Sequence, residues 1–241
     1  MNDEVNDNNG RGKNGSLLIF FVLLALVAAG IGAWFYFEKS QSDTTPNAEG
    51  ETSEVVARVN GVEIDRSSYE RSLEQLRAAY VSQGIDVSNA TSSELLKEQA
   101  IESLVNRQLI VMAAKSKGLT VEGTAIDAEY QNVVEGAGGN EAFAAALVAS
   151  NLSEVMVRAD IENGLLIQQY LATELRINEL TVTDAEVESY YNSAKETNSD
   201  VPALSEVSAA IQSQLLTEKR DAAVNAALKT LRETAEIEIL I

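Results

Sequence analysis

The sequence predicts a mostly helical protein that carries one small β-sheet and is preceded by a membrane-spanning helix. Three observations predict this fold class. Apolar residues recur at helical spacing over most of the chain after residue 65. Strand-like alternation occurs at 55–64 and at 236–241, the two ends of the region with these patterns. An apolar run at 17–37 stands apart from both and contains no charged residue.

The run at 17–37, LLIFFVLLALVAAGIGAWFYF, is long enough to cross about 30 Å of hydrocarbon as a helix. Arg11 and Lys13 precede it, and the positive-inside rule then places the N-terminus in the cytoplasm. A cleaved signal peptide is the alternative, but its apolar region is normally shorter and ends at small residues, whereas this run ends in Trp-Phe-Tyr-Phe. We expect a single-pass cell-membrane protein with four parts: a cytoplasmic tail at 1–16, a transmembrane anchor at 17–37, a flexible linker at 38–54 and an extracytoplasmic domain at 55–241.

The first folded element is predicted to be a β-hairpin over VVARVNGVEI, residues 55–64, with Asn60-Gly61 as its two-residue turn. This turn sets Val59 opposite Val62 and Ala57 opposite Ile64, which makes one face apolar. Arg58 then lies opposite Glu63 on the other face, as a cross-strand ion pair.

A lone hairpin is barely stable in water, so this one needs a further strand. The final six residues, EIEILI, alternate acidic and aliphatic side chains and form the other strand-like pattern. We therefore predict that 236–241 adds to the hairpin as a third strand, with its isoleucines on the apolar face.

Helices are predicted between these strands from periodicity and from start and stop signals. They run from about Ser67 to Gly84, Thr91 to Gly118, Thr124 to Glu135, 141 to 150, 154 to 175, 184 to 196, and from about Ser205 to the final strand. The predicted starts are capping boxes at Ser67 with Glu70, Thr91 with Glu94 and Thr183 with Glu186, and single caps at Asn140 and Ser153.

Composition excludes several classes of function. The chain has 37 Asp and Glu against 18 Lys and Arg, a net charge of −19, which argues against nucleic-acid binding because that depends on neutralising phosphates. It has no Cys and no His, so disulfides, thiolate metal sites and a histidine general base are excluded. No catalytic, cofactor-binding or metal-binding residue is expected.

Four segments together resemble the N-terminal chaperone domain of SurA-type proteins, which are extracytoplasmic chaperones and peptidyl-prolyl isomerases related in layout to PrsA and PpiD. The segments are VARVNGVEIDRSSYERSLEQL, AIESLVNRQLIVMAAKSKGLTVEGTAIDAEY, EAFAAALVASNLSEVMVRADIENGLLIQQYL and LTVTDAEVESYYN. The resemblance covers about 55–192 and, more loosely, 205–241. It implies a helical chaperone module with a small sheet made from both ends of the domain.

In proteins of this type a parvulin isomerase domain usually lies between the helix like DAEVESYYN and the last long helix. Here only about residues 195–204 stand at that place, and the His and Cys expected in a parvulin active site are absent. We therefore expect a SurA-like domain without isomerase activity.

The function implied is an ATP-independent holdase, a chaperone that binds unfolded or newly exported polypeptides without a cofactor. Such binding needs an exposed apolar surface surrounded by polar residues. Met is useful in such a surface because its flexible side chain adapts to different partners. The alternatives are a structural or adaptor module that docks one envelope partner, and a residual prolyl isomerase. The candidate client-binding residues, each of which could instead be ordinary core, are Leu73, Leu76, Tyr80, Leu109, Met112, Phe143, Leu147, Met156 and Tyr170.

Overall fold

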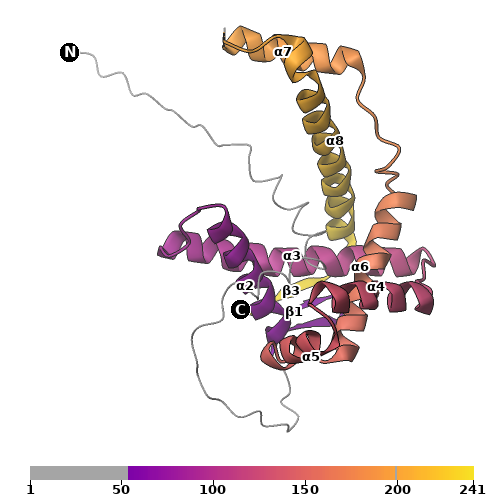
Figure 1. The fold of residues 1–241 in the computed structure, drawn as a ribbon. Helices are drawn as coiled ribbons and strands as arrows, with labels where there is room; N and C mark the ends of the chain where they lie inside the picture. Colours follow the sequence, from indigo (N-terminus) through magenta and orange to yellow (C-terminus); the bar gives the residue numbers. More distant parts are fainter. Residues whose placement is uncertain (1–53, 199) are drawn as a thin grey trace.

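The computed structural model describes residues 54–198 and 200–241 (Figure 1). The predicted tail, the membrane span and all but the last residue of the linker lie outside the described residues. The described elements are β1 (Val55–Val59), β2 (Val62–Asp65), α2 (Arg66–Ser82), α3 (Ala90–Ser116), α4 (Gly123–Gly136), α5 (Asn140–Ala149), α6 (Glu154–Thr173), α7 (Asp184–Thr197), α8 (Leu204–Thr234) and β3 (Ile237–Ile239). The prediction of a mostly helical domain with one small sheet is confirmed.

The sheet has the order β2-β1-β3, and β1 is antiparallel to both neighbours. The predicted hairpin pairs are confirmed, with Val59 opposite Val62 and Ala57 opposite Ile64. Asn60 and Gly61 have φ values of 48° and 80°, the positive values that a type I′ turn requires at both positions. The C-terminal strand is the predicted third strand, so the two ends of the domain meet in one sheet.

The two faces of the sheet differ in chemistry, as their alternation predicts. On the solvent face Arg58 lies between two acidic partners, with Nη2 3.4 Å from Glu63 and Nη1 3.1 Å from Glu238. On the inner face Ala57 and Val59 are fully buried. Burial of the inner face therefore stabilises the hairpin. On the solvent face the ion pairs place an acidic, a basic and an acidic side chain next to one another across the three strands.

Asn60 joins the turn to the C-terminal strand. Its backbone N–H donates to the Glu236 carbonyl at 2.8 Å, and its side-chain Oδ1 accepts from the Glu236 N–H at 2.7 Å. At the other end of the strand the Leu240 N–H donates to the Val56 carbonyl at 2.9 Å. These bonds hold β3 against β1 on both sides of the Arg58–Glu238 pair.

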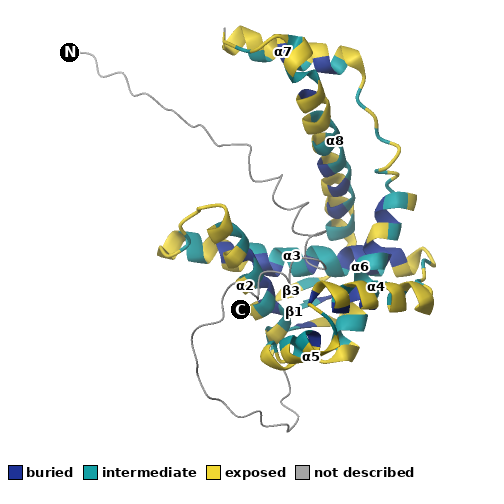
Figure 2. Cartoon of the chain, viewed as in Figure 1, coloured by how far each residue is buried: buried dark blue, intermediate teal, exposed yellow. Residues whose placement is uncertain are grey.

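Helix α3 is the central element of the body, and Figure 2 shows buried residues running along it. Its first half packs with α2 and the inner face of the sheet, in a cluster that includes Leu96 and Val105. Its second half packs with α6 and the end of α8, around Leu166 and Leu228. A third cluster, with Ile161, joins α4, α5 and α6.

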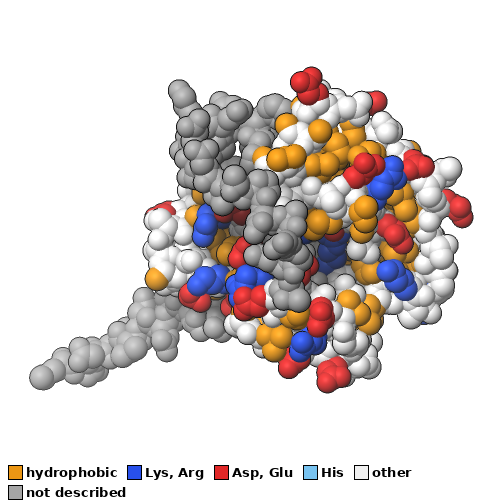
Figure 3. Space-filling view, turned by 90° about the horizontal axis from the view of Figure 1, so that it is seen from below, with side chains coloured by type: hydrophobic (Ala, Val, Ile, Leu, Met, Phe, Trp, Pro, Cys, Tyr) orange, Lys and Arg blue, Asp and Glu red, His pale blue; other side chains and the backbone are white. Residues whose placement is uncertain are grey.

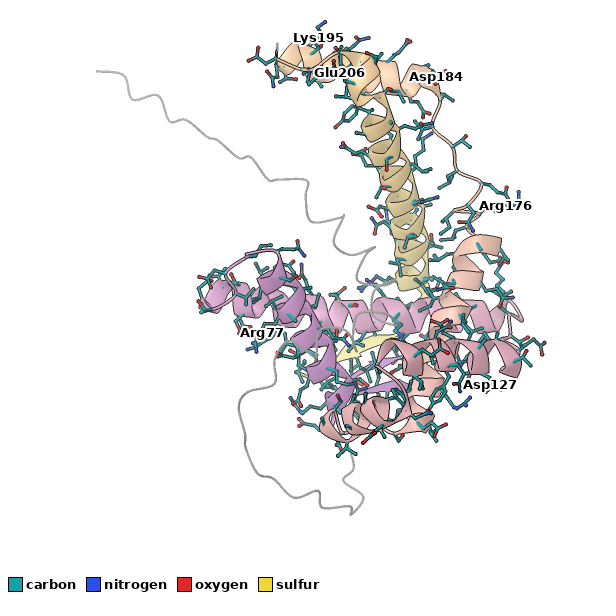
Figure 4. The ribbon with its side chains drawn as sticks, in the orientation of Figure 1. Arg77, Asp127, Arg176, Asp184, Lys195 and Glu206 are labelled. Carbon is teal, nitrogen blue, oxygen red and sulfur yellow. The ribbon has the colours of Figure 1, made fainter. Side chains whose placement is uncertain are left out.

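Helix α7 and the first half of α8 form an arm that stands away from this body, while the end of α8 packs against α3 and α6 (Figure 1). The far end of the arm has its own small cluster, built on Val187, Tyr191 and Ile211. Charged side chains such as Asp184, Lys195 and Glu206 surround that end (Figure 4). The arm is therefore held together by α7 packing on α8, separately from the main core.

The N-terminus of α7 is fixed by the predicted capping box between Thr183 and Glu186, which the structure confirms. Lys219 on α8 donates to the Thr181 carbonyl at 2.7 Å and to Glu186 Oε2 at 2.9 Å. The hydrogen bonds from Lys219 and from Thr183 hold the pKa of Glu186 down at about 2, compared with the usual 4.5.

Three of the five predicted caps differ in the structure. Asp65, directly after β2, caps α2 in place of Ser67, and Asn89 caps α3 in place of Thr91. Both helices therefore begin earlier than predicted, because these residues accept the backbone N–H three positions on. At α5 the cap is Gly139, with φ 99°, which puts Asn140 inside the helix. The Ser153 cap is confirmed.

Over residues 54–198 and 200–241, no helix taken singly has the length and apolar character needed to cross a membrane. The α5 and α6 helices meet that criterion only when they are counted together, and they are bent by 96°.

Candidate functional site

The structure covers each of the nine predicted client-binding residues at least in part. Leu76, Leu109, Phe143 and Tyr170 are buried. The other five are half-buried, namely Leu73, Tyr80, Met112, Leu147 and Met156. None of the nine is fully exposed, so their main contacts are within the protein.

These residues also do not form one surface. Five belong to the cluster around the sheet, α2 and α3, and they are Leu73, Leu76, Tyr80, Leu109 and Met112. Phe143 and Leu147 lie in the α4–α5–α6 cluster, and Tyr170 lies where α3, α6 and α8 meet. The structure thus separates eight of the nine over three core clusters, and half-buried Met156 belongs to none of these clusters.

The large apolar side chains that are exposed are different residues, and they gather at three places. The first is the α2–α3 tip, the second is the α5–α6 bend, and the third is the outer rim of the sheet. The members are, in that order, Val81, Ile85 and Leu95; Val148 and Val155; and Val62, Ile239, Leu240 and Ile241. Figure 3, a view from below, shows hydrophobic side chains lying beside charged ones on that face of the molecule.

A signal for four of these residues is present in the sequence. Each directly adjoins a buried or half-buried apolar residue, in the pairs Tyr80-Val81, Leu95-Leu96, Leu147-Val148 and Val155-Met156. Neighbouring residues on a helix point about 100° apart, so two adjacent apolar residues are seldom both covered by one contact. From these pairs our sequence analysis selected Tyr80, Leu147 and Met156, and it selected none of the four exposed neighbours.

The α5–α6 bend carries the most exposed pair. Val148 is 78% exposed and Val155 is 75% exposed. The chain turns between them through Asn151, with φ 50°, and the Ser153 side chain caps α6 by accepting from the Met156 N–H at 3.2 Å. A short bend, followed by a helix start that Ser153 caps, therefore holds two solvent-exposed valines on the outside of the body.

A polar and aromatic network fixes the base of this bend. Arg158 on α6 lies 2.6 Å from Asp127 on α4, a residue labelled in Figure 4, and 4.4 Å above the ring of Tyr130. Tyr130 in turn contacts Phe143 of α5 edge-on at 5.5 Å, and burial raises the pKa of its hydroxyl. The three helices are thus tied together below the exposed valines.

The α2–α3 tip is built in a similar way. Gly84, with φ 75°, ends the turn after α2, and the Asn89 side chain starts α3 by accepting from the Ser92 N–H at 2.9 Å. Tyr80 donates its hydroxyl to Gln99 at 2.9 Å and links the two helices. Val81 and Leu95 remain 58% and 54% exposed on either side of this link.

Several charged groups of the described residues form ion pairs or cap helices, as Arg107 does with Asp160, Lys219 with Glu186, and Asp65 at the start of α2. No group of three or more His, Cys, Asp or Glu side chains within that part of the chain is placed to hold a metal ion. Asp221 on α8 is the buried carboxylate of this region; burial raises its pKa, with Glu218 adding to the effect. The chemistry that this arrangement offers is binding by apolar surface and by sheet edge.

Comparison with known proteins identifies the family. The model of the SurA-like N-terminal domain family matches residues 10–171, which is more than half of the chain. The chain belongs to this family. The match ends in α6, so the arm and β3 of this SurA-like protein lie beyond the matched region, although β3 completes the sheet.

A curated relative is the foldase protein PrsA of Caldanaerobacter subterraneus subsp. tengcongensis. It is 25% identical over 183 residues, covering 73% of this SurA-like chain and 51% of the relative. The chain thus spans about half the length of the curated relative that it matches.

Proposed function

We propose that this SurA-like protein is a chaperone of the holdase type, which binds unfolded or newly exported polypeptide segments without ATP or a cofactor. Its membership of the SurA-like N-terminal domain family supports this proposal, and so does its similarity to a protein named as a foldase.

The observation that carries the proposal is the placement of the exposed apolar side chains. They lie at the α2–α3 tip, the α5–α6 bend and the rim of the sheet, outside a body with its own packed core. Exposed apolar groups framed by charge are typical of surfaces that bind other chains. Several small patches suit segments that differ in sequence better than one deep pocket does.

We further propose that the protein lacks prolyl isomerase activity. The connection between α7 and α8, where the resemblance implies a parvulin domain, is only residues 198–203. The sequence contains no His and no Cys to serve a parvulin active site.

The proposed location is the outer side of the cell membrane. Residues 17–37 are the proposed anchor and 1–16 the proposed cytoplasmic tail, so that the folded domain meets chains as they emerge from export. This part of the proposal depends on the apolar run and on the charges that precede it.

An aggregation assay tests the binding function. The full chain, purified in mild detergent, should suppress aggregation of a chemically unfolded client at a near-equimolar ratio. Val148→Asp should weaken suppression, because it puts a charge on the α5–α6 bend. Asn151→Asp is the matched control, since it adds the same charge to the same bend and keeps the apolar side chain. Absence of suppression by the folded wild-type chain would refute the holdase function.

Two further assays separate the alternatives. Cross-linking in cells should capture many unrelated client chains, whereas one stoichiometric partner would instead identify an adaptor. A protease-coupled assay on a proline peptide should give the uncatalysed rate, and a faster rate would identify a residual isomerase.

A further inference from the structure

Strand β3 lies at the edge of the sheet, and the pairing shows which of its backbone groups are left over. Glu236 and Leu240 direct backbone groups to β1, since the Glu236 carbonyl accepts from Asn60 and the Leu240 N–H donates to Val56. Backbone groups alternate in direction along a strand, so those of Ile237 and Ile239 point to the outer edge. Because β3 is the last strand in the order β2-β1-β3, no strand of the described region lies beyond that edge. Ile239 and Ile241 are 46% and 50% exposed there.

The side chains across the sheet define what would suit this edge. On the solvent face the row Glu63, Arg58, Glu238 alternates in charge, and the Glu238 side chain is 54% exposed at the open end of the row. The next position in this row is therefore complementary to a Lys or Arg. On the other face, Ile237 and Ile239 end rows of apolar side chains, which favours apolar neighbours.

We propose that the outer edge of β3 binds an extended polypeptide segment as a fourth strand, with preference for segments in which apolar and basic residues alternate. This inference rests on the proposed function, because the segment is part of a bound client. Strand addition uses main-chain hydrogen bonds for affinity and alternate side chains for selectivity. A second copy of this chain suits the edge poorly, since its own β3 would set acidic residues beside Glu238.

Binding of short synthetic peptides to the full chain tests this proposal. The probe is an eight-residue peptide of alternating Val and Lys, and its partner is the Val and Glu equivalent. A scrambled peptide of the same Val and Lys composition sets the baseline, because a protein with net charge −19 attracts any cation. We expect the alternating Lys peptide to bind about tenfold or more tightly than the scrambled and Glu peptides at moderate salt.

Variants of the edge locate the site. Ile239→Pro removes an outward N–H and leaves the bonds to β1 in place, which edge strands tolerate. It should weaken binding of the Lys peptide about tenfold, whereas Ile239→Ala, which keeps the N–H, should have a smaller effect. Glu238→Gln should bring the ratio of Lys-peptide to Glu-peptide affinity toward one.

A modified peptide gives the same test without altering the protein. N-methylation of the peptide amides that face β3 should abolish binding to the wild-type chain. Equal binding of the methylated peptide, or equal affinity of Ile239→Pro and Ile239→Ala, would overturn the proposal. A wild-type dimer that binds no peptide and is dissociated by Ile239→Pro would identify a second copy as the occupant, and would overturn it as well.

The aggregation assay separates this inference from the proposed function. If Ile239→Pro leaves both peptide affinity and aggregation suppression unchanged, the chaperone function stands and the edge is not its site. If the wild-type chain suppresses no aggregation and still binds the alternating peptide by its edge, the edge site is supported and the holdase function is refuted.

Discussion

Replacing Asn60 separates two contributions of one side chain to closing the sheet. Asn60 adopts φ 48°, which residues other than Gly, Asn and Asp reach at a cost, and its Oδ1 accepts the Glu236 N–H at 2.7 Å. Asn60→Gly keeps the backbone conformation and loses the side-chain bond. Asn60→Ala loses both. Asn60→Asp keeps an acceptor and tolerates the same backbone conformation, so it is the control.

The expected losses follow from these two contributions. A net hydrogen bond contributes about 1 kcal/mol, and a left-handed conformation costs an alanine about 1 kcal/mol. Asn60→Ala should therefore lower the free energy of unfolding by about 2 kcal/mol and Asn60→Gly by about 1 kcal/mol. For a domain of this size these values correspond to shifts in Tm of about 6 °C and about 3 °C.

Two measurements check this reasoning. Thermal and urea unfolding, followed by helical circular dichroism, give the stability of the four proteins in the order wild type, Asp, Gly, Ala. Hydrogen exchange of the segment 236–241 should be faster in the Gly and Ala variants than in the Asp variant. Equal stability of the Gly and Ala variants would show that backbone strain at this turn does not matter. Unchanged exchange of the segment would show that the Asn60 side chain does not hold β3.

Three further changes test other parts of the fold. Deletion of 236–241 should lower the Tm, because β1 loses a paired strand; an unchanged melting curve would contradict the role of β3. Leu228→Ala, at a side chain 5% exposed between α3, α6 and α8, should cost about 3 kcal/mol in urea unfolding, and half-buried Leu215→Ala on the arm about 1 kcal/mol. Losses of equal size would mean that the arm is as tightly packed as the body. Because the folded-state pKa of Glu186 is lowered to about 2, its stabilisation of the α7 start is present above about pH 4.5 and is lost as the pH falls toward 2. The protection factors of the α7 amides, which are corrected for the intrinsic pH dependence of hydrogen exchange, should fall over this range in the wild type and vary less in Glu186→Gln; the same acid dependence in both would refute the role of Glu186.

The turn and the strand pairing could be predicted because they depend on local chemistry and on a shortage of alternatives. Asn60-Gly61 fixes the hairpin register, and EIEILI is the remaining alternating segment. Helix starts were harder, since several capping residues compete within a few positions. Asp65 and Ser67 are both suitable caps, and the end of β2 selects Asp65.

The burial of the candidate residues could be predicted less well than the fold. Leu76 and Phe143 fit the apolar stripes of their helices, and the structure buries them because those stripes face neighbouring helices. Val81 and Val148 lie beside the stripes, so they stay exposed at the tip and the bend. Periodicity shows that a helix has an apolar side, but not how wide a part of that side its neighbours cover.

The sequence by itself determined the helical class, the hairpin register and the closing of the domain by its last strand, since each follows from side-chain spacing and turn chemistry over a few residues. Only the tertiary structure decided that α3 is the central helix, that α7 and the first half of α8 form a separate arm, and that β3 keeps one edge free. Those features depend on contacts between segments far apart in the chain. The physical reason is that the burial of a side chain is a property of the neighbours that fold against it, and its own helix or strand does not specify them.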